Sequence, residues 1–449
     1  MYKIILAFRY LLKRRITYFA VLAVALSVFI VVVVMTVMTG LVNDFKQKNH
    51  DFVGDCVVGT ESLVGFAYYE DFIQKLESED FVEGISPVVK SFALKRRRGS
   101  GLDDVVEIMG IDPLMHCRAT NFGETLYFHR NNVSEMFVPT YDPNLAGCVQ
   151  GIDLLLYRSA DNNYPHEAIL DRIGYSISCF PLTARGALAQ VGTDIVNTRT
   201  FYNSDHSHSG LAKVDGTMVY LPLEQAQWLC GMDGSVKRIS AIHIKFKPDV
   251  KMETGREKIS SLWIDFKQRK ADESQAYLLD TVTVQNWKDY KRATIAPMEQ
   301  EQTVMTVMFA FVGITTVFII FVVFYMIISH KSKDIGILKS IGVSNFNIVQ
   351  LFSGFAFLVG FIGSAIGLLA GWLFLLRINR IENWLFEHFR FQLWDRTIYA
   401  IGDIPSQVDL KVVIIIFLSA IAACLVGALL PSFQAALQEP VKTLQVGQL

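Results

Sequence analysis

The chain has 449 residues, of which 51% are hydrophobic, and its mean hydropathy is +0.33. This composition is too apolar for an ordinary soluble enzyme, and the 19% of charged residues is too high for a protein made only of membrane helices. The formal net charge of −1 provides no overall basic field, so nucleic acid is excluded as an expected partner.

The N-terminal residues predict a membrane helix. Residues 1–16 mix apolar with basic side chains, which indicates an interfacial helix on the cytoplasmic side of the membrane. The apolar run at 17–40 is long enough to cross a hydrocarbon core of about 30 Å. Because this run is longer than the apolar region of a signal peptide, we predict a first transmembrane helix with a cytoplasmic N-terminus. A cleaved signal is the alternative.

The segment 41–286 is typical of a folded domain. It is polar, carries turn signals such as Asp142-Pro143 and alternates strand-like runs such as 239–246 with helix-like stretches such as 68–79. Its length is sufficient for an α+β domain with its own core. Because the first membrane helix starts in the cytoplasm, this domain is expected outside the cytoplasm.

Five of the six cysteines lie in this domain: Cys56, Cys117, Cys148, Cys179 and Cys230. They show no CxxC or metal-ligand spacing. Their odd number argues against a fully paired disulfide framework, and leaves one or two bridges open in an oxidising compartment.

Two polar clusters in the domain suggest binding chemistry. His206 and His208 could hold a metal with Asp205, but no second cluster at ligand spacing accompanies them. A solvated polar loop is therefore the favoured interpretation. The basic run 95–98 is interpreted as a solvated hairpin tip rather than an anion site.

Three further apolar segments complete the chain. The predicted elements are a stalk and second transmembrane helix at 287–329, a cytoplasmic coupling helix at 330–347, a third span at 348–376, a periplasmic loop with an interfacial helix at 377–409, a fourth span at 410–431 and a cytoplasmic tail at 432–449. The predicted fold class is a membrane protein with four transmembrane α-helices in a 1+3 order. A large extracytoplasmic α+β domain is inserted between the first helix and the second.

The loop at 330–347 is the most informative part of the chain. Its basic residues outnumber its single acid, Asp334, so it should face the cytoplasm. Ile335, Ile337, Leu338 and Ile341 predict one apolar face on a short amphipathic helix. Such a helix is either a docking knob for a cytoplasmic partner or a charged tether between two spans.

The spans themselves limit the function. Gly363, Gly367 and Gly371 are four residues apart in the third span, which is typical of close helix contact, although a flexible apolar helix is the alternative. No charged residue lies in the middle of any predicted span, which disfavours an ion-coupled carrier. The sequence contains no GxxxxGK[ST] phosphate loop, so the chain is not expected to be an enzyme that hydrolyses nucleotide.

Two motifs carry a resemblance to a known family. HKSKDIGILKSIGVS at 330–344 resembles the coupling segment of FtsX-like/MacB-type ABC transporter permeases, and LLPSFQAALQEPVKTLQ at 429–445 is similar to that family's C-terminal ending. Within the family the chain looks closest to the lipoprotein-releasing LolC/LolE branch, through stretches such as VEIMGIDP at 106–113 and VQNWKDYKRATIAPMEQEQTVM at 284–305. The resemblance covers nearly the whole chain.

The resemblance implies a permease subunit in the cell inner membrane, with both termini cytoplasmic and a periplasmic domain made of a MacB-like core plus a smaller subdomain. It implies no catalytic or metal residue and no cofactor on this chain, because ATP-Mg would bind to a separate LolD-like ATPase. ATP-driven motion would reach the external domain by mechanotransmission. A lipoprotein would be extracted from the outer leaflet and passed to a LolA-like periplasmic carrier. A homodimer, or a heterodimer with a second permease, is expected in contact with membrane lipids.

The resemblance also assigns sites. The residues expected to couple to the ATPase are Lys331, Asp334, Ile335, Ile337, Leu338, Lys339, Ile341 and Gly342. Those expected to line a lipid or substrate cavity are Val34, Met38, Met305 and Phe309. The expected carrier-binding loop contains Phe180, Pro181 and Leu182.

Three alternatives remain open at the level of sequence. The first is a MacB-like permease for efflux or peptide export. The second is an FtsX-like scaffold that signals to a cell-wall hydrolase. The third is a membrane-anchored enzyme whose active site lies within 41–302.

Overall fold

The computed structural model of the chain describes residues 15–98, 103–156, 164–166, 172–189, 196–330, 332–389 and 409–437. The chain divides into two compact units. One comprises Met1–Asp44, Pro297–Leu393 and Asp403–Leu449, and the other comprises Phe45–Ala296 with Trp394–Gly402. Most of the interfacial helix predicted at 1–16, and the predicted tail beyond residue 437, lie outside the described residues.

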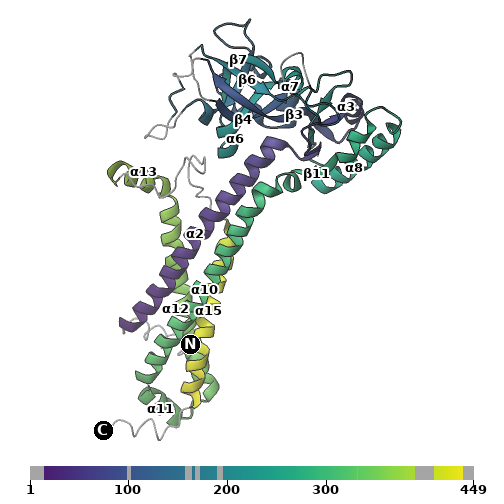
Figure 1. Cartoon of the computed structure of the whole chain (residues 1–449). Coiled ribbons are helices and arrows are strands. Elements are labelled where there is room, and N and C mark those ends of the chain that lie inside the picture. The colour runs from purple at the N-terminus through teal and green to yellow at the C-terminus, as the bar shows by residue number, and fades with distance from the viewer. Residues whose placement is uncertain are drawn as a thin grey trace. The chain divides into compact units, whose positions relative to one another are not determined.

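The first unit contains the membrane helices (Figure 1). Among the described residues, four helices are long and apolar enough to cross a membrane: α2 (Arg15–Val53), α10 (Arg292–His330), α12 (Asn345–Leu375) and α15 (Leu410–Leu437). One precedes the second unit in the sequence and three follow it, which confirms the predicted 1+3 order. Two shorter helices, α11 (Ser332–Ser340) and α13 (Ile378–Phe389), follow α10 and α12.

Glycines allow α12 to approach α2 closely within this unit. A Cβ atom added at Gly363 would lie 2.8 Å from the Cβ of Val24, and one added at Gly367 would lie 2.5 Å from the carbonyl oxygen of Ala25. Real side chains do not tolerate such distances, so the two helices meet backbone to backbone at these positions. The predicted packing role of these two glycines is confirmed.

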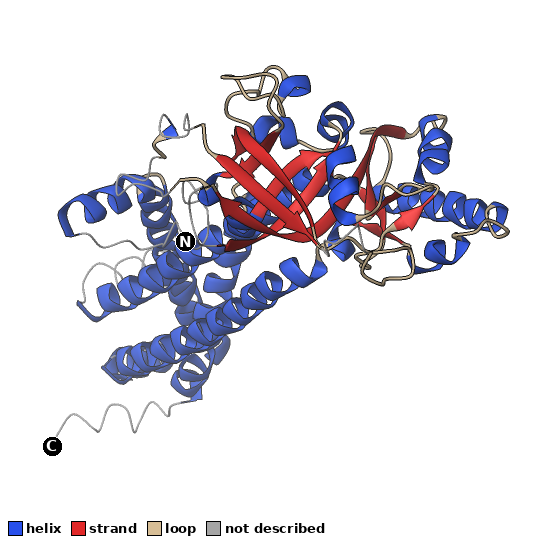
Figure 2. Cartoon of the chain, turned by 45° about the horizontal axis from the view of Figure 1, so that its top comes forward, coloured by secondary structure: helices blue, strands red, loops and turns tan. Residues whose placement is uncertain are grey.

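Among the described residues, the second unit is built on a nine-stranded mixed sheet, whose strands are red in Figure 2. The strand order is β11-β1-β10-β3-β4-β8-β5-β7-β6. The strands are β1 (Cys56–Gly59), β3 (Val82–Arg97), β4 (Asp103–Ile111), β5 (Gly147–Gly151), β6 (Gly174–Cys179), β7 (Asn197–Ser207), β8 (Met218–Pro222), β10 (Ala241–Phe246) and β11 (Thr283–Asn286). A separate pair is formed by β2 (Phe66–Ala67) and β9 (Arg238–Ile239).

The long strand β3 organises this sheet. It pairs antiparallel with β10 through its first half and with β4 through most of its length. Its last four residues, Leu94–Arg97, also pair with β6, which is the final strand in the order above. Six of the strands, from β3 round to β6, therefore close on themselves, and β10, β1 and β11 extend the sheet on the other side of β3.

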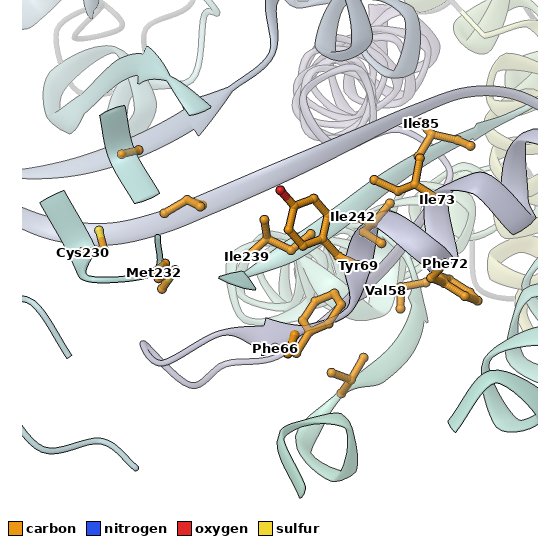
Figure 3. Packing of buried hydrophobic residues seen from close by; sticks show 14 of the residues in the cluster. Val58, Phe66, Tyr69, Phe72, Ile73, Ile85, Cys230, Met232, Ile239 and Ile242 are labelled. Atoms are coloured by element: carbon orange, nitrogen blue, oxygen red, sulfur yellow. The ribbon is translucent and has the colours of Figure 1, made fainter. Parts of the chain in front are cut away.

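Apolar side chains cover both faces of the sheet. In β1, Cys56 and Val58 belong to one buried cluster and Val57 belongs to another, because successive strand residues point to opposite faces. The larger cluster is completed by α3 (Tyr69–Glu77), α7 (Leu223–Cys230) and α8 (Met252–Arg269). Figure 3 shows part of it around Phe66 and Phe72.

Shorter helices complete the second unit. The smaller cluster is covered by α4 (Pro113–Ala119), α5 (Phe122–Thr125), α6 (Ala212–Thr217) and α9 (Trp287–Tyr290). The 3-10 turns are η1 (Val133–Glu135), η2 (Ile152–Leu154) and η4 (Ala276–Thr281). The unit is an α+β domain, as the sequence predicts.

We expect Gly367→Ala to weaken the packing of α12 on α2, because the new Cβ would meet a backbone oxygen that cannot move without its helix. Overpacking of this kind costs about 1–3 kcal/mol, so the melting temperature of the purified protein should fall by several degrees. The matched control is Gly354→Ala on the same helix, where an added Cβ meets no atom within 4 Å. Equal melting temperatures for the two variants would contradict this packing.

Candidate functional site

The predicted coupling segment forms a short helix followed by a tight turn. Gly342 follows α11 with a φ of +95°, a conformation that glycine adopts without the strain of a Cβ atom. The Val343 N–H donates to the carbonyl of Leu338 at 3.1 Å, which closes the end of α11. The hydroxyl of Ser344 accepts from the Asn347 N–H and caps the start of α12. The turn therefore fixes where α11 ends and α12 begins.

One side of α11 packs into the protein itself. Ile335 is 3% exposed and lies in a cluster with Ile348 of α12 and Ala435 of α15. Lys339, one turn further along, donates from its ammonium group to the carbonyl oxygen of Ala436 at 2.7 Å. This places a positive charge at the C-terminal end of α15, where the helix dipole is negative. The two contacts hold α11 against α12 and α15.

The other side of α11 is apolar and exposed. Ile337 is 49% exposed, Ile341 is 76% exposed, and Phe346, just after the turn, is 75% exposed. We call these three residues the α11 outer face. The prediction that Ile335 shares a face with Ile337 and Ile341 is wrong, since residues two apart on a helix are separated by about 200°. Phe346 is absent from the predicted site because it lies beyond the recognised motif, although an aromatic residue in a short basic loop is a usable signal.

The remaining predicted coupling residues do not share one environment. Leu338 is partly buried between the two sides, and Gly342 shapes the turn. Asp334 belongs to α11, but its side chain and the whole of Lys331 lie outside the described residues.

The predicted carrier-binding residues lie in a small hairpin of the second unit, residues 180–189. Leu182 and Leu188 form an antiparallel bridge, and the Thr183 N–H donates to a carbonyl across the turn at 2.8 Å. Phe180 is half exposed, Pro181 is buried and Leu182 is partly buried, while Leu188 on the opposite side is exposed. The structure therefore adds Leu188 to the exposed apolar groups of this hairpin.

Arg238 holds the base of the 180–189 hairpin. Its buried guanidinium donates to the carbonyl oxygens of Val64, Leu182 and Gly231 at 2.6–2.8 Å. In addition, the Leu182 N–H donates to the carbonyl of Cys230 at 3.1 Å. One cation thus joins three loop segments, and the exposed part of the hairpin extends from a fixed base.

Four residues are predicted to line a lipid cavity: Val34 and Met38 on α2, and Met305 and Phe309 on α10. They lie between two polar contacts that join these helices. The contacts are Thr316 with Ser27 at 3.0 Å and Gln302 with Thr39 at 3.4 Å. Met38 is buried, and the other three are partly buried. The structure brings all four to the same stretch of the helix pair.

Asp205 and His206 are not in a solvated loop, so that interpretation is wrong. Both are buried near the end of β7, where Asp205 accepts hydrogen bonds from the backbone N–H groups of Phe128, His129 and His206 at 2.7–2.9 Å. Burial raises the pKa of Asp205, but these bonds and one from the His129 ring outweigh it and hold the pKa below its usual value. Its oxygens are engaged within the protein, and no group of metal-binding side chains occurs in the described part of the chain.

The basic run 95–98 is only partly a solvated tip. Lys95 is buried, and its ammonium donates to the side-chain oxygen of Gln150 at 3.3 Å. The side chain of Lys95 points into the closed part of the sheet because alternate residues of β3 face inward. Arg96 is exposed and pairs with Asp103 across the hairpin.

The sequence is similar to known membrane proteins over nearly its whole length. Residues 306–440, from α10 to beyond α15, match the family model for the FtsX-like permease C-terminal region. The lipoprotein-releasing system transmembrane protein LolC of Xylella fastidiosa is 19% identical over 95% of this chain and 92% of its own length. LolC of Neisseria meningitidis is 20% identical over 96% of this chain and 94% of its own.

One further relative and one solved structure complete the comparison. The lipoprotein-releasing system transmembrane protein LolE of Haemophilus influenzae is 21% identical over 95% of this chain and 93% of its own length. The solved periplasmic region of MacB from Actinobacillus actinomycetemcomitans has 13% identity and a TM-score of 0.29, and the match covers 55% of this chain and 95% of that one. The chain is therefore a multi-pass membrane protein that carries an FtsX-like permease domain and is related over nearly its whole length to LolC and LolE.

Proposed function

We propose that the chain is the permease subunit of an ABC transporter that extracts lipoproteins from the outer leaflet of the inner membrane and passes them to a periplasmic carrier. A separate ATPase would supply the energy through mechanotransmission. The observation that carries this proposal is the α11 outer face, since a short helix between two membrane spans presents exposed apolar side chains while its opposite side is fixed to the membrane helices.

The α11 outer face has the chemistry of a docking surface. Burying a large apolar side chain contributes about 1.5–3 kcal/mol, so burial of Ile341 and Phe346 in a groove of the ATPase would stabilise the complex. Ile335 and Lys339 hold α11 against α12 and α15, so displacement of the outer face would displace those helices with it. A tether would need neither the apolar outer face nor the internal contacts.

The paired stretch of α2 and α10 suits an acyl chain. Val34, Met38, Met305 and Phe309 are apolar, and methionine side chains adapt to ligands of variable shape. The mechanism we propose has the lipid anchor enter between these helices from the outer leaflet. ATP-driven closure of the transporter, which includes a second permease subunit, would then expel it.

The 180–189 hairpin is the proposed contact for the carrier. Phe180 and Leu188 present apolar surface, and Arg238 holds the hairpin base. A hairpin of this kind engages a partner without rearranging the domain that bears it. We place it in the periplasm, where the released lipoprotein would be transferred.

Replacing Ile341 with Glu should detach the ATPase, because an unpaired carboxylate would be buried at the contact. We expect at least a 100-fold loss of affinity, equivalent to about 2.7 kcal/mol, measured as the amount of nucleotide-binding subunit that co-purifies in lipid. Ile341→Leu is the control and should retain the subunit. If the Glu variant keeps its ATPase, the α11 outer face is not the docking surface.

Phe180→Asp and Leu188→Asp should each reduce capture of the periplasmic carrier by about 10-fold or more, since each removes apolar contact area and adds a charge. Ile264→Asp on α8 is the matched control, because that side chain is equally exposed but lies outside the hairpin. Capture would be measured by cross-linking in membranes followed by mass spectrometry. Recovery of a channel adaptor or a hydrolase in place of a lipoprotein carrier would refute the proposed transfer step.

Phe309→Asn should slow lipoprotein release from reconstituted liposomes, since a polar amide in the acyl path disfavours the lipid anchor. Phe311→Asn is the control at the same depth of α10, because Phe311 is exposed on a different side of the helix. ATP hydrolysis by the assembled complex should persist in both variants. Normal release by the Phe309 variant would show that the anchor does not pass this position.

A further inference from the structure

Two cysteine sulfurs meet at the base of the 180–189 hairpin. Cys179 ends β6 and Cys230 ends α7, and their Sγ atoms lie 3.8 Å apart. Both side chains are almost fully buried. All six cysteines lie in the part of the chain that the structure describes, and within it no other two are in hydrogen-bonding contact.

We propose that Cys179 and Cys230 form a disulfide bond in the mature protein. The proposal rests on the placement of the domain in the periplasm under the proposed function, since protein thiols are oxidised there and remain reduced in the cytosol. It gives the hairpin a covalent anchor that neither the spacing of the cysteines nor the family resemblance indicates.

The fold already holds the two sulfurs next to each other. They are at van der Waals distance, 3.8 Å apart, and a disulfide bond of about 2.05 Å requires them to approach further. Hydrogen bonds hold the two segments in place. The Leu182 N–H donates to the Cys230 carbonyl at 3.1 Å. Asn197, which lies opposite Cys179 on the neighbouring strand β7, donates from its side chain to the Trp228 carbonyl at 2.8 Å. The bridge therefore joins segments that the fold has already placed side by side.

The other cysteines of the domain have a different environment. Burial raises the pKa of Cys56 to about 12, of Cys148 to about 12 and of Cys117 to about 11, so these thiols stay protonated and unreactive. The hydrogen bond between the two thiols lowers the pKa of Cys179 and raises that of Cys230. Among the described cysteines, only Cys179 and Cys230 are in hydrogen-bonding contact with another thiol.

The bond forms by two thiol–disulfide exchanges. The Cys179 thiolate attacks a disulfide of an oxidoreductase or of a small-molecule disulfide such as oxidised glutathione, and one thiolate of that reagent leaves. The Cys230 thiolate then attacks the Cys179 sulfur, and the second thiol of the reagent leaves. Two protons are released from the cysteines and two electrons pass to the reagent, which becomes fully reduced. Because both sulfurs are buried in the folded domain, the exchange takes place before the hairpin base closes.

The bridge constrains the unfolded chain and the hairpin together. Linking residues 179 and 230 closes a loop of about 50 residues, which lowers the entropy of the unfolded state. It also joins the strand that leads into the hairpin to the helix whose last carbonyl binds Leu182. The hairpin base then stays in place when force is applied to its exposed part.

The test counts thiols in the full-length protein, isolated from bacterial membranes with an alkylating reagent present throughout. After denaturation, four of the six cysteines should be alkylated without reduction and all six after it, and the peptides that contain Cys179 and Cys230 should be linked. In Cys179→Ser, all five remaining cysteines should react without reduction. Cys148→Ser is the control and should retain the linked pair. Reductant should lower the melting temperature of the wild type by roughly 5–10 °C and leave Cys179→Ser unchanged.

Alkylation of all six cysteines without reduction, or linkage of any other pair, would overturn the proposal. Treatment of the purified, reduced protein with oxidised glutathione, in a denaturant that opens the hairpin base and is then removed, shows which premise failed. If glutathione links Cys179 to Cys230, the domain does not lie in an oxidising compartment, and the topology in the proposed function fails with it. If it does not, the two sulfurs are wrongly placed and the proposed function is unaffected.

Discussion

The internal packing of α11 is the constraint on which the membrane part of this molecule depends. The side chain of Ile335 on α11 packs among residues of α12 and α15, and the ammonium group of Lys339 donates a hydrogen bond to the last turn of α15. These contacts join a segment of nine residues to two membrane helices that are themselves in close contact. Because this side is fixed, a force applied to the exposed Ile337, Ile341 and Phe346 would be transmitted to α12 and α15. Without these contacts, α11 could move without displacing the membrane helices.

An analogous arrangement recurs in the second unit. The 180–189 hairpin has an exposed apolar part and a base held by Arg238, whose charge is shared among three carbonyl groups. Carbonyl oxygens from three segments converge on one planar group, so displacement of any one segment strains bonds to the other two. In both units, therefore, the surface proposed to meet a partner stands on residues whose own contacts are internal.

The sequence predicts some of this and not the rest, for physical reasons. The spans follow from runs of apolar residues. The glycine spacing in α12 predicts a close helix contact, and the structure shows that the partner is α2. The two sides of α11 are harder to predict, since Ile335, Ile337 and Ile341 are equally apolar and only the contact with α12 and α15 decides which one is buried. The residues predicted for the carrier contact fall in a hairpin, and the bridge that brings Leu188 beside Leu182 there is not visible in the composition.

Buried polar groups in the domain were the least predictable feature. The SDHSHSG stretch has the composition of a solvated loop, yet Asp205 is buried because backbone donors at 128 and 129 converge on it from a distant part of the chain. Likewise Lys95 appears in the sequence as one of four adjacent basic residues, and only the alternation of β3 turns it inward. Such outcomes depend on contacts between remote segments, which local patterns do not contain.

The pairing of β1 with β11 has a consequence for how this protein is made. Cys56 lies opposite Asn286, so the strand that follows the first membrane helix is completed by the strand that immediately precedes α9 and the next membrane helix. The sheet cannot be finished until almost the whole domain has left the ribosome, by which time synthesis of the second span is about to begin. A sheet that joins such distant residues forms slowly, and its unpaired strands are exposed to aggregation in the meantime. Completion of the sheet is thus tied to synthesis of the second membrane helix, because its last strand lies directly before α9 and α10.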